Sequence, residues 1–522
     1  MLLSAHDLTV SVADRTLVEV EQLEIHAGDH IGLIGKNGTG KTTLLNVLAN
    51  EKKPEEGEII SYTSIDFIHQ LKEQIAAKSG GEITQQHIQQ AFATRAELLF
   101  ADEPTTHLDK EHIEWVEKKF LHWQGAFVVV SHDRAFLDRV CNKIWEIDQG
   151  ELHEYSGNYQ SYQEQKDLKR QAQQTEHEKY QEKKQQLEQA IIQKTERAQR
   201  ATKKPSRVSN SEASIIGAKP YFAKKQKKMQ KTAKALETRL DKLEKVEKPY
   251  EEKPLKMILP QQEKLSGRTI IQVENLSGYA GNKQLWKPSS FQVKAGTKLA
   301  IIGENGSGKT TLLHYLLDRK DGITVSSACQ IGYFQQNLAL LDTKRSILEN
   351  VQEDTLQDET LVRTVLARLH FYGEQVHKKI AVLSGGERVK VSLAKILLSN
   401  SNTLILDEPT NFLDIEAMEA LEKLLIEYEG TLIFVSHDRR FVEKIATATL
   451  EIKDNQLHFF AGSYQNYLEH QQQPSEPSAE QEDLLLIETK ITEVLGKLSL
   501  EPNKELEEEF QRLLKKKRQL QE

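Results

Sequence analysis

Two glycine-rich stretches carry the residues best suited to phosphate chemistry. They read GKNGTGKTT at Gly35–Thr43 and GENGSGKTT at Gly303–Thr311, and both match G-x-x-x-x-G-K-[ST]. Glycines let successive backbone N–H groups turn toward an anion, the lysine reaches the β- and γ-phosphates, and the following hydroxyl can bind Mg²⁺. The expected nucleotide-binding residues are Gly35, Asn37, Gly38, Gly40, Lys41, Thr42 and Thr43 in the first stretch, and Gly303, Asn305, Gly306, Gly308, Lys309, Thr310 and Thr311 in the second.

Paired carboxylates and a histidine follow each loop. Asp102 and Asp407 end apolar runs that are typical of buried parallel strands, and such strand ends are where ligands of α/β sheets bind. Each Asp is expected to hold Mg²⁺ through water. The next residues, Glu103 and Glu408, are the candidates to polarise the attacking water. His132 and His437 each follow a further apolar strand in the sequence SHD, which favours a position near the γ-phosphate.

These residues belong to a repeat of the whole motif series. SGGE occurs at Ser79–Glu82 and again at Ser384–Glu387, and both the Asp-Glu segment and the SHD segment also occur twice in the same order. Each phosphate-binding loop lies between an apolar strand-like run (HIGLIG or KLAIIG) and a helical TTLL segment. The order strand, glycine-rich turn, helix is the context that such a loop requires. The duplication therefore predicts two nucleotide-binding domains.

Composition limits the class of protein. The 522 residues carry a net charge of −8, and 38% of them are hydrophobic. No apolar run approaches the roughly 20 residues that span a bilayer, and the N-terminus lacks the pattern of a secretory signal. The two cysteines, Cys141 and Cys329, are too few for a disulfide framework, and we expect two buried or inert thiols. The predicted location is cytoplasmic.

The charge is unevenly distributed. Residues 171–250 hold 20 Lys and Arg against 10 Asp and Glu, and residues 191–230 hold 11 against 2. The stretches from about 166 to 199 and from about 224 to 246 are rich in good helix formers, and the second has an apolar seam. We therefore expect an antiparallel helical hairpin with its bend between Pro205 and Pro220. The seam residues are Met229, Ala233, Leu236, Leu240 and Leu243.

The bend combines basic flanks with an uncharged middle. Cations on both sides favour contact with nucleic-acid phosphates, although a solvated helix face is the usual explanation for a charge run. Tyr221 and Phe222 can stack on unpaired bases or pack against the hairpin. The residues that we expect to form an RNA-contacting loop, at about 203–222, include Lys203, Lys204, Arg207, Ile215, Ile216, Lys219, Tyr221 and Phe222.

Over roughly residues 1–160 and 268–470 the motifs resemble the ATP-binding cassette superfamily. In that family two cassettes face each other, and each ATP is held between the loop of one and the SGGE signature of the other. The resemblance implies one site with Lys41, Gln70, Asp102, Glu103 and His132 facing Ser384, Gly385, Gly386 and Glu387. It implies a second site with Lys309, Gln336, Asp407, Glu408 and His437 facing Ser79, Gly80, Gly81 and Glu82. Gln70 and Gln336 would bind Mg²⁺, and Asp109 and Asp414 match a loop that communicates between the sites.

Two cassettes in one chain with a charged helical linker are similar to the ABC-F family of ribosome-associated ATPases. The shortened first cassette and the C-terminal tail resemble its Vga-type antibiotic-resistance members most. This resemblance implies ATP and Mg²⁺ as cofactors and the 70S ribosome as partner, with contacts to 23S rRNA at the exit-tRNA site and to tRNA near the peptidyl-transferase centre. The implied drugs are lincosamides, streptogramin A compounds and pleuromutilins.

The two halves differ in two respects. Gln70 and Ser79 are nine positions apart whereas Gln336 and Ser384 are 48 apart, so the first half lacks most of the helical subdomain. No aromatic residue upstream of the first loop is an evident partner for adenine. In the second half both Tyr279 and Trp286 remain candidates.

The expected fold class is α/β, with two P-loop cassettes joined by the helical hairpin. The expected domains are a first cassette at 1–165, a linker at 166–262, a second cassette at 268–470 and a C-terminal helical extension at 475–522. A ribosome-protection ATPase is the leading function. A housekeeping translation factor that acts on stalled ribosomes and the ATPase subunit of a membrane exporter are the alternatives.

Overall fold

The computed structural model describes residues 1–12, 15–69, 88–94, 96–106, 108–200, 218–243, 257, 267–335, 340–472 and 510–513. Its contacts divide the chain into two units. The first unit comprises residues 1–256 together with 367–371 and 413–420, and the second comprises the rest. Gln70, Ser79–Glu82, Gln336, the loop from Lys203 to Ile216 and nearly all of the predicted C-terminal extension lie outside the described residues.

A nine-stranded sheet forms the core of the first unit, in the order β4-β1-β2-β9-β8-β3-β7-β6-β5. β5 pairs in parallel with β6, β6 with β7, β7 with β3, and β3 with β8. β1 pairs antiparallel with β2 and β4, and β9 pairs antiparallel with β8. Every residue of β6 and β7 is buried, which accounts for their uninterrupted apolar sequences because a parallel sheet is covered on both faces. The strands are β1 Leu3–Val12, β2 Arg15–Ile25, β3 His30–Gly35, β4 Glu56–Ser61, β5 Ile65–Ile68, β6 Leu98–Asp102, β7 Ala126–Val130, β8 Lys143–Asp148 and β9 Glu151–Ser156.

Short helices follow the parallel strands, and two of them are capped by aspartate side chains. They are α1 Lys41–Leu48, α3 Lys110–Leu121 and α4 Arg134–Val140. Asp109 accepts from His112 N at the start of α3, and Asp133 accepts from Ala135 N and Phe136 N at the start of α4. Each cap satisfies backbone N–H groups that have no partner within the helix.

The second unit repeats this arrangement with two sheets. Their orders are β14-β15-β16-β12-β17-β18 and β11-β10-β13. The strands are β10 Thr269–Ala280, β11 Lys283–Lys294, β12 Lys298–Gly303, β13 Ile323–Val325, β14 Ile331–Phe334, β15 Thr403–Asp407, β16 Thr431–Val435, β17 Ala448–Lys453 and β18 Gln456–Ala461. The helices that lie wholly or partly in this unit are α8 Lys309–Leu317, α9 Ile347–Gln352, α10 Glu359–Arg368, α11 Gly385–Leu397, α12 Ile415–Glu427, α13 Arg439–Ile445 and α14 Tyr464–Gln472, with 3₁₀ turns η3 Gly373–His377 and η4 Ile380–Val382.

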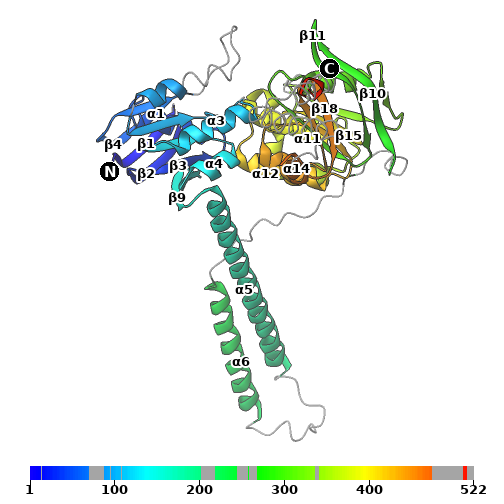
Figure 1. The fold of residues 1–522 in the computed structure, drawn as a ribbon. Helices are drawn as coiled ribbons and strands as arrows, with labels where there is room; N and C mark the ends of the chain where they lie inside the picture. Colours follow the sequence, from blue (N-terminus) through cyan, green and yellow to red (C-terminus); the bar gives the residue numbers. More distant parts are fainter. Residues whose placement is uncertain are drawn as a thin grey trace. The chain divides into compact units, whose positions relative to one another are not determined.

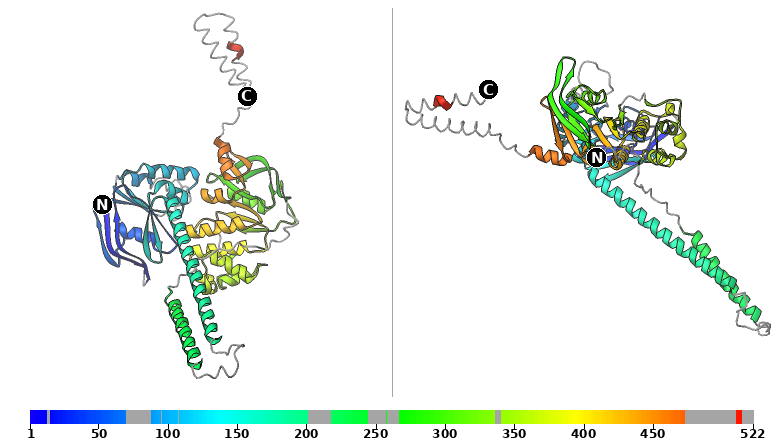
Figure 2. Two further views of the ribbon diagram at one scale, coloured as in Figure 1. Left: turned by 90° about the horizontal axis from the view of Figure 1, so that it is seen from below. Right: turned by 90° about the vertical axis from the view of Figure 1, so that its right-hand side faces the viewer.

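Two long helices form an arm on the first unit. These are α5 Tyr159–Arg200, which is about 60 Å long at 1.5 Å per residue, and α6 Ala218–Asp241. They lie side by side and antiparallel (Figures 1 and 2). Ala233 of α6, one of the predicted seam residues, is buried, and Ala198 of α5 is buried as well.

The ends of these helices differ from the prediction. α5 begins seven residues before residue 166 because Tyr159 and Tyr162 are buried at its root, where Tyr162 Oη donates to Glu146 at 2.6 Å. α6 begins at Ala218, so the prediction that the bend extends to Pro220 is wrong. Proline is tolerated there because N–H groups in the first turn have no intrahelical acceptor. α6 also ends at Asp241 rather than near residue 246.

None of the helices in the described parts of the chain combines the length and the apolar character that crossing a membrane requires.

Candidate active sites

The phosphate-binding loops have the same backbone geometry in both units. Gly40 and Gly308 cap their helices in the left-handed region, with φ of 101° and 104°. Lys41 Nζ donates to Gly35 O at 2.7 Å and to Lys36 O at 3.0 Å. Lys309 Nζ donates to Gly303 O and Glu304 O, each at 2.9 Å. Each ammonium is therefore largely buried within its own loop, beside the helix N-terminus where a phosphate is expected to bind.

A hydroxyl and a carboxylate meet beside each loop. The Thr42 side chain hydrogen-bonds Asp102, and the Thr310 side chain hydrogen-bonds Asp407. Burial raises the pKa of both aspartates, and the hydrogen bonds from the threonines oppose that rise. These oxygen donors fit Mg²⁺, which prefers carboxylates and keeps several waters. Thr42 and Asp102 would hold the ion in the first unit and Thr310 and Asp407 in the second, where it would supply positive charge opposite the phosphates.

The glutamates after the strands have a strained backbone. Glu103 has φ +52° and Glu408 has φ +48°, a region that costs a non-glycine residue about 1–3 kcal/mol. The backbone is held by hydrogen bonds from Glu103 N to Val130 O at 2.9 Å and from Glu408 N to Val435 O at 3.0 Å. This geometry turns each carboxyl toward the loop that follows the neighbouring strand.

A histidine contacts each of these carboxyls. His132 Nε2 lies 3.3 Å from Glu103 Oε1, and His437 Nε2 lies 3.3 Å from Glu408 Oε1. Burial raises the pKa of Glu103 to about 7, although the charge of Lys41 opposes the rise, and burial likewise raises the pKa of Glu408. A carboxyl that titrates near neutrality is suited to accept a proton from an attacking water.

One cavity joins these groups in the first unit. Its volume is about 450 Å³, within the usual range of small-molecule sites. Its lining includes Lys41, Thr42, Asp102, Glu103 and His132. The phosphate-binding loop, the Mg²⁺ candidates and the candidate base therefore face the same space.

Residues 413–420 belong to the first unit and carry the Asp414 segment singled out in the sequence. Asp414 Oδ2 accepts from Asn37 N at 3.0 Å, and Glu416 Oε2 lies 3.3 Å from Lys36 Nζ. Glu419 Oε1 accepts from Tyr159 Oη at 3.1 Å at the root of α5. This segment thus contacts both the phosphate-binding loop and the arm.

The signature Ser384–Glu387 forms the beginning of α11. Ser384 Oγ accepts from Glu387 N at 3.3 Å, and Glu387 Oε2 accepts from Ser384 N at 2.8 Å. Together these bonds make a capping box. Nothing lies within 4 Å of a Cβ added at Gly385, so the backbone here is open to a ligand.

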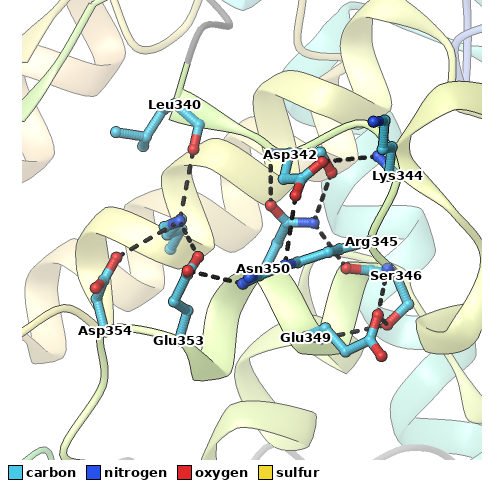
Figure 3. A network of polar contacts seen from close by, with 10 residues as sticks. Leu340, Asp342, Lys344, Arg345, Ser346, Glu349, Asn350, Glu353 and Asp354 are labelled. Atoms are coloured by element: carbon cyan, nitrogen blue, oxygen red, sulfur yellow. Dashed lines mark hydrogen bonds and ion pairs between the residues drawn. The ribbon is translucent and has the colours of Figure 1, made fainter.

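A polar network supports this helix (Figure 3). The fully buried Asn350 of α9 accepts from Asp342 N at 2.8 Å and donates to Asp342 O at 3.0 Å and Ser346 O at 2.9 Å. Lys395 of α11, which is 8% exposed, contacts Leu340 O, Glu353 and Asp354 within 3.5 Å. The network therefore joins the segment after β14 to the signature helix.

The structure decides between the two aromatic candidates of the second unit. Trp286 is fully buried, and its ring lies 2.2 Å from a Cβ added at Gly278 and 2.7 Å from one added at Gly308. It is a packing residue beneath the loop, so the interpretation of Trp286 as an adenine partner is wrong. Tyr279 is 49% exposed and remains the candidate.

Three cavity-lining residues of the first unit escaped the sequence reasoning. Val12, Arg15 and Leu17 lie on the hairpin that precedes the loop. The sequence signal that could have identified these three residues is their position in the hairpin, because the corresponding hairpin of the second half carries Tyr279. They were missed because only aromatic side chains were considered as partners for adenine.

The raised pKa of Glu103 predicts a pH-dependent stability. An unfolded Glu ionises near 4.5, so between pH 4.5 and about 7 the folded protein binds more protons and its stability falls as the pH rises. At about 1.4 kcal/mol for each pH unit the loss reaches roughly 3 kcal/mol. Glu103→Gln removes it, so we expect its melting temperature to exceed that of the parent at pH 8 and to equal it at pH 4.5. The exposed Glu111→Gln is the control, and an equal difference at both pH values would contradict the assignment.

Replacing Asn350 by Leu is expected to weaken the support of α11. The backbone N–H and C=O of Asp342 then lose the fully buried Asn350 amide as their partner, at a cost of about 1–3 kcal/mol. Thermal unfolding should therefore occur at a lower temperature, and amide exchange in residues 340–346 should accelerate. Lys344→Ala in the same segment, whose side chain is exposed, should change neither quantity. Unchanged exchange in Asn350→Leu would disprove the supporting role.

Comparison with known proteins agrees with this architecture. A family model described as ABC transporter matches residues 19–78 and 286–411, and a second model with the same description matches residues 145–214. Such ATP-binding domains imply ATPase activity with ATP and Mg²⁺. Among solved structures, the RNase-L Inhibitor shares the fold, with a TM-score of 0.58, 16% identity, and coverage of 89% of this chain and 92% of that chain.

Two curated relatives match much more closely in sequence. The chain is 33% identical to the ribosome protection protein VmlR of Bacillus subtilis (strain 168), over 98% of this chain and 97% of that protein. It is also 33% identical to the erythromycin resistance ATP-binding protein MsrA of Staphylococcus epidermidis, over 87% of this chain and 97% of that protein. With its two cassettes and these relatives, the chain belongs to the ABC-F family, within which it resembles the antibiotic-resistance ribosome protection proteins.

Proposed function

We propose that this protein is an ATP-dependent ribosome-protection factor. It binds the bacterial 70S ribosome at the exit-tRNA site and dislodges large-subunit antibiotics of the lincosamide, streptogramin A and pleuromutilin classes. ATP binding favours the ribosome-bound form, and hydrolysis allows release. The observation that carries the proposal is the combination, in one chain, of two equivalent ATPase constellations with a basic helical arm, and the name of VmlR supports it.

The residues of each unit divide the hydrolytic work. Lys41 and Lys309 bind the phosphates, and the backbone N–H groups of the loops orient them. Glu103 and Glu408 accept the proton of the attacking water, which their raised pKa favours at neutral pH. His132 and His437 position the carboxyl relative to the γ-phosphate, since each imidazole already lies 3.3 Å from its glutamate.

The arm supplies the contact with RNA. Lys224, Lys227 and Lys228 are exposed on the first turns of α6, next to the bend. Lysines at this spacing bind phosphates without reading sequence, so affinity should depend on salt. The loop that follows α5 in the sequence lies outside the described residues, and it is proposed to approach the peptidyl-transferase centre with Ile215 and Ile216.

The proposed roles are assigned to the domains that the sequence predicts. Residues 1–165 and 268–470 act as the two cassettes in a cytoplasmic protein, and 166–262 act as the ribosome-contacting linker. The partners are 23S rRNA at the exit-tRNA site and the tRNA near the peptidyl-transferase centre.

Expression in a drug-susceptible bacterium tests the function. The parent chain should raise the inhibitory concentration of a lincosamide or pleuromutilin without lowering cellular drug accumulation. The pair Glu103→Gln and Glu408→Gln should abolish resistance and accumulate on 70S ribosomes with ATP, because binding is retained while proton acceptance is lost. Lower drug accumulation would instead indicate export, and failure of the pair to co-sediment at low salt would overturn the proposal.

The lysines of α6 are expected to set the salt dependence of ribosome binding. In the Glu-to-Gln background, changing Lys224, Lys227 and Lys228 together to Gln should lower the slope of log affinity against log salt by about 2–3. Changing Lys231, Lys234 and Lys242 to Gln removes the same charge farther along the exposed surface of the arm and serves as the control. Equal slopes for the two triple variants would show that the bend has no special role in RNA contact.

A further inference from the structure

The hairpin before each phosphate-binding loop packs against that loop in the same way in both units. A Cβ added at Gly40 would lie 2.9 Å from Leu17 Cβ, and one added at Gly308 would lie 2.7 Å from Leu285 Cδ1. Leu17 and Leu285 each lie two residues into the second strand of their hairpin. The two hairpins are therefore equivalent by contact as well as by sequence position.

Strand register then fixes which residues correspond at the hairpin ends. In the first unit Val12 pairs with Arg15 and Ser11 with Thr16. In the second unit Ala280 pairs with Lys283 and Tyr279 with Gln284. The position of the exposed Tyr279 is thus taken by Ser11 in the first unit, and no aromatic ring is present there.

The cavity of the first unit extends from the phosphate-binding loop to this hairpin end. Asp102, Glu103 and Lys41 line it at one end, while Val12, Arg15 and Leu17 contribute from the hairpin. Val12 is 45% exposed, so its side chain offers an open apolar surface. A nucleotide whose triphosphate lies on the loop must place its base toward this second group, because the cavity is continuous.

We propose that Arg15, with Val12, forms the base-binding platform of the first site and that this site accepts guanine as well as adenine nucleotides. The proposal rests on nucleotide binding in this cavity as argued above, and it adds a specificity-determining residue. In the second unit the register places Lys283 where the first unit has Arg15, and the exposed Tyr279 on the facing strand binds the base by aromatic stacking.

The chemistry of the guanidinium group explains the expected tolerance. Its planar, weakly hydrated surface can stack on either purine. If it instead meets the edge of the base, guanine offers two acceptors, O6 and N7, whereas adenine offers N7 beside the N6 donor. Guanine is therefore at least as favourable as adenine in both orientations.

Fluorescent ATP and GTP analogues can be titrated into the full chain to test this. Lys309→Ala blocks the second site, so the titration reports the first. We expect the dissociation constants of the two analogues to agree within about threefold. Arg15→Ala should weaken both by about 5- to 150-fold, since base stacking contributes roughly 1–3 kcal/mol. Arg15→Tyr should restore the binding of the ATP analogue.

Matched variants keep the outcome decisive. Thr16→Ala changes the next residue, on the opposite face of β2, and should leave both dissociation constants unchanged. Arg15→Lys keeps the charge without the planar group and should recover less than half of the lost binding energy. Full recovery by Lys, no loss in Arg15→Ala, or a preference for ATP above tenfold in the Lys309→Ala background with native Arg15 would overturn the proposal.

The readout separates this inference from the proposed function. Nucleotide titration does not involve the ribosome. Co-sedimentation of the chain with native Arg15 on ribosomes does not depend on knowing which base the first site binds. An unchanged melting temperature of Arg15→Ala without nucleotide excludes misfolding as the cause of weaker binding. If that temperature falls, nucleotide binding of the parent is compared with that of the Arg15→Tyr variant instead.

Discussion

Parallel pairing of buried strands is the constraint on which the catalytic geometry depends. β3, β7 and β6 in the first unit, and β12, β16 and β15 in the second, pair in register along their lengths. Their carboxyl ends therefore deliver the loop, the histidine and the Asp-Glu pair to one edge. The same burial that stabilises the strands desolvates Glu103 and Glu408 and raises their pKa. Fold stability and catalytic competence thus have a common physical origin, and the left-handed backbone of each glutamate adds strain at the same place.

Each unit has the same residue types at this edge of its sheet, but the surrounding elements differ between the units. Both hold a lysine in the loop carbonyls and a glutamate against a histidine. In the second unit, α9, α10 and α11 lie between β14 and β15 and support the signature through Asn350 and Lys395. The hairpin ends differ as well, with Tyr279 in one unit and Ser11 and Arg15 in the other. The same arrangement of lysine, glutamate and histidine is therefore combined with different supporting elements and different residues at the hairpin end.

The root of the arm links nucleotide chemistry to the rest of the first unit. α5 continues directly from β9 and is fixed by the buried Tyr159 and Tyr162. Glu419 accepts hydrogen bonds from both Tyr159 and Gln163, and Glu416 of the same segment lies beside Lys36 of the phosphate-binding loop. The segment 413–420 therefore contacts both the phosphate-binding loop and the first turns of α5.

The sequence alone determined the motif pairs, the cassette fold and the helical hairpin, because phosphate loops, apolar strands and helical seams are local patterns. It also identified Lys41, Asp102, Glu103 and His132 as residues that should share a site, and the cavity of the first unit brings them together. Only the tertiary structure decided that Trp286 lies beneath the loop and that Arg15 lines the cavity of the first unit. Burial and cross-strand register depend on contacts between distant segments, and a side chain's type does not reveal them. For the same reason the start of α5 was set by packing of Tyr159 and Tyr162 rather than by helix propensity.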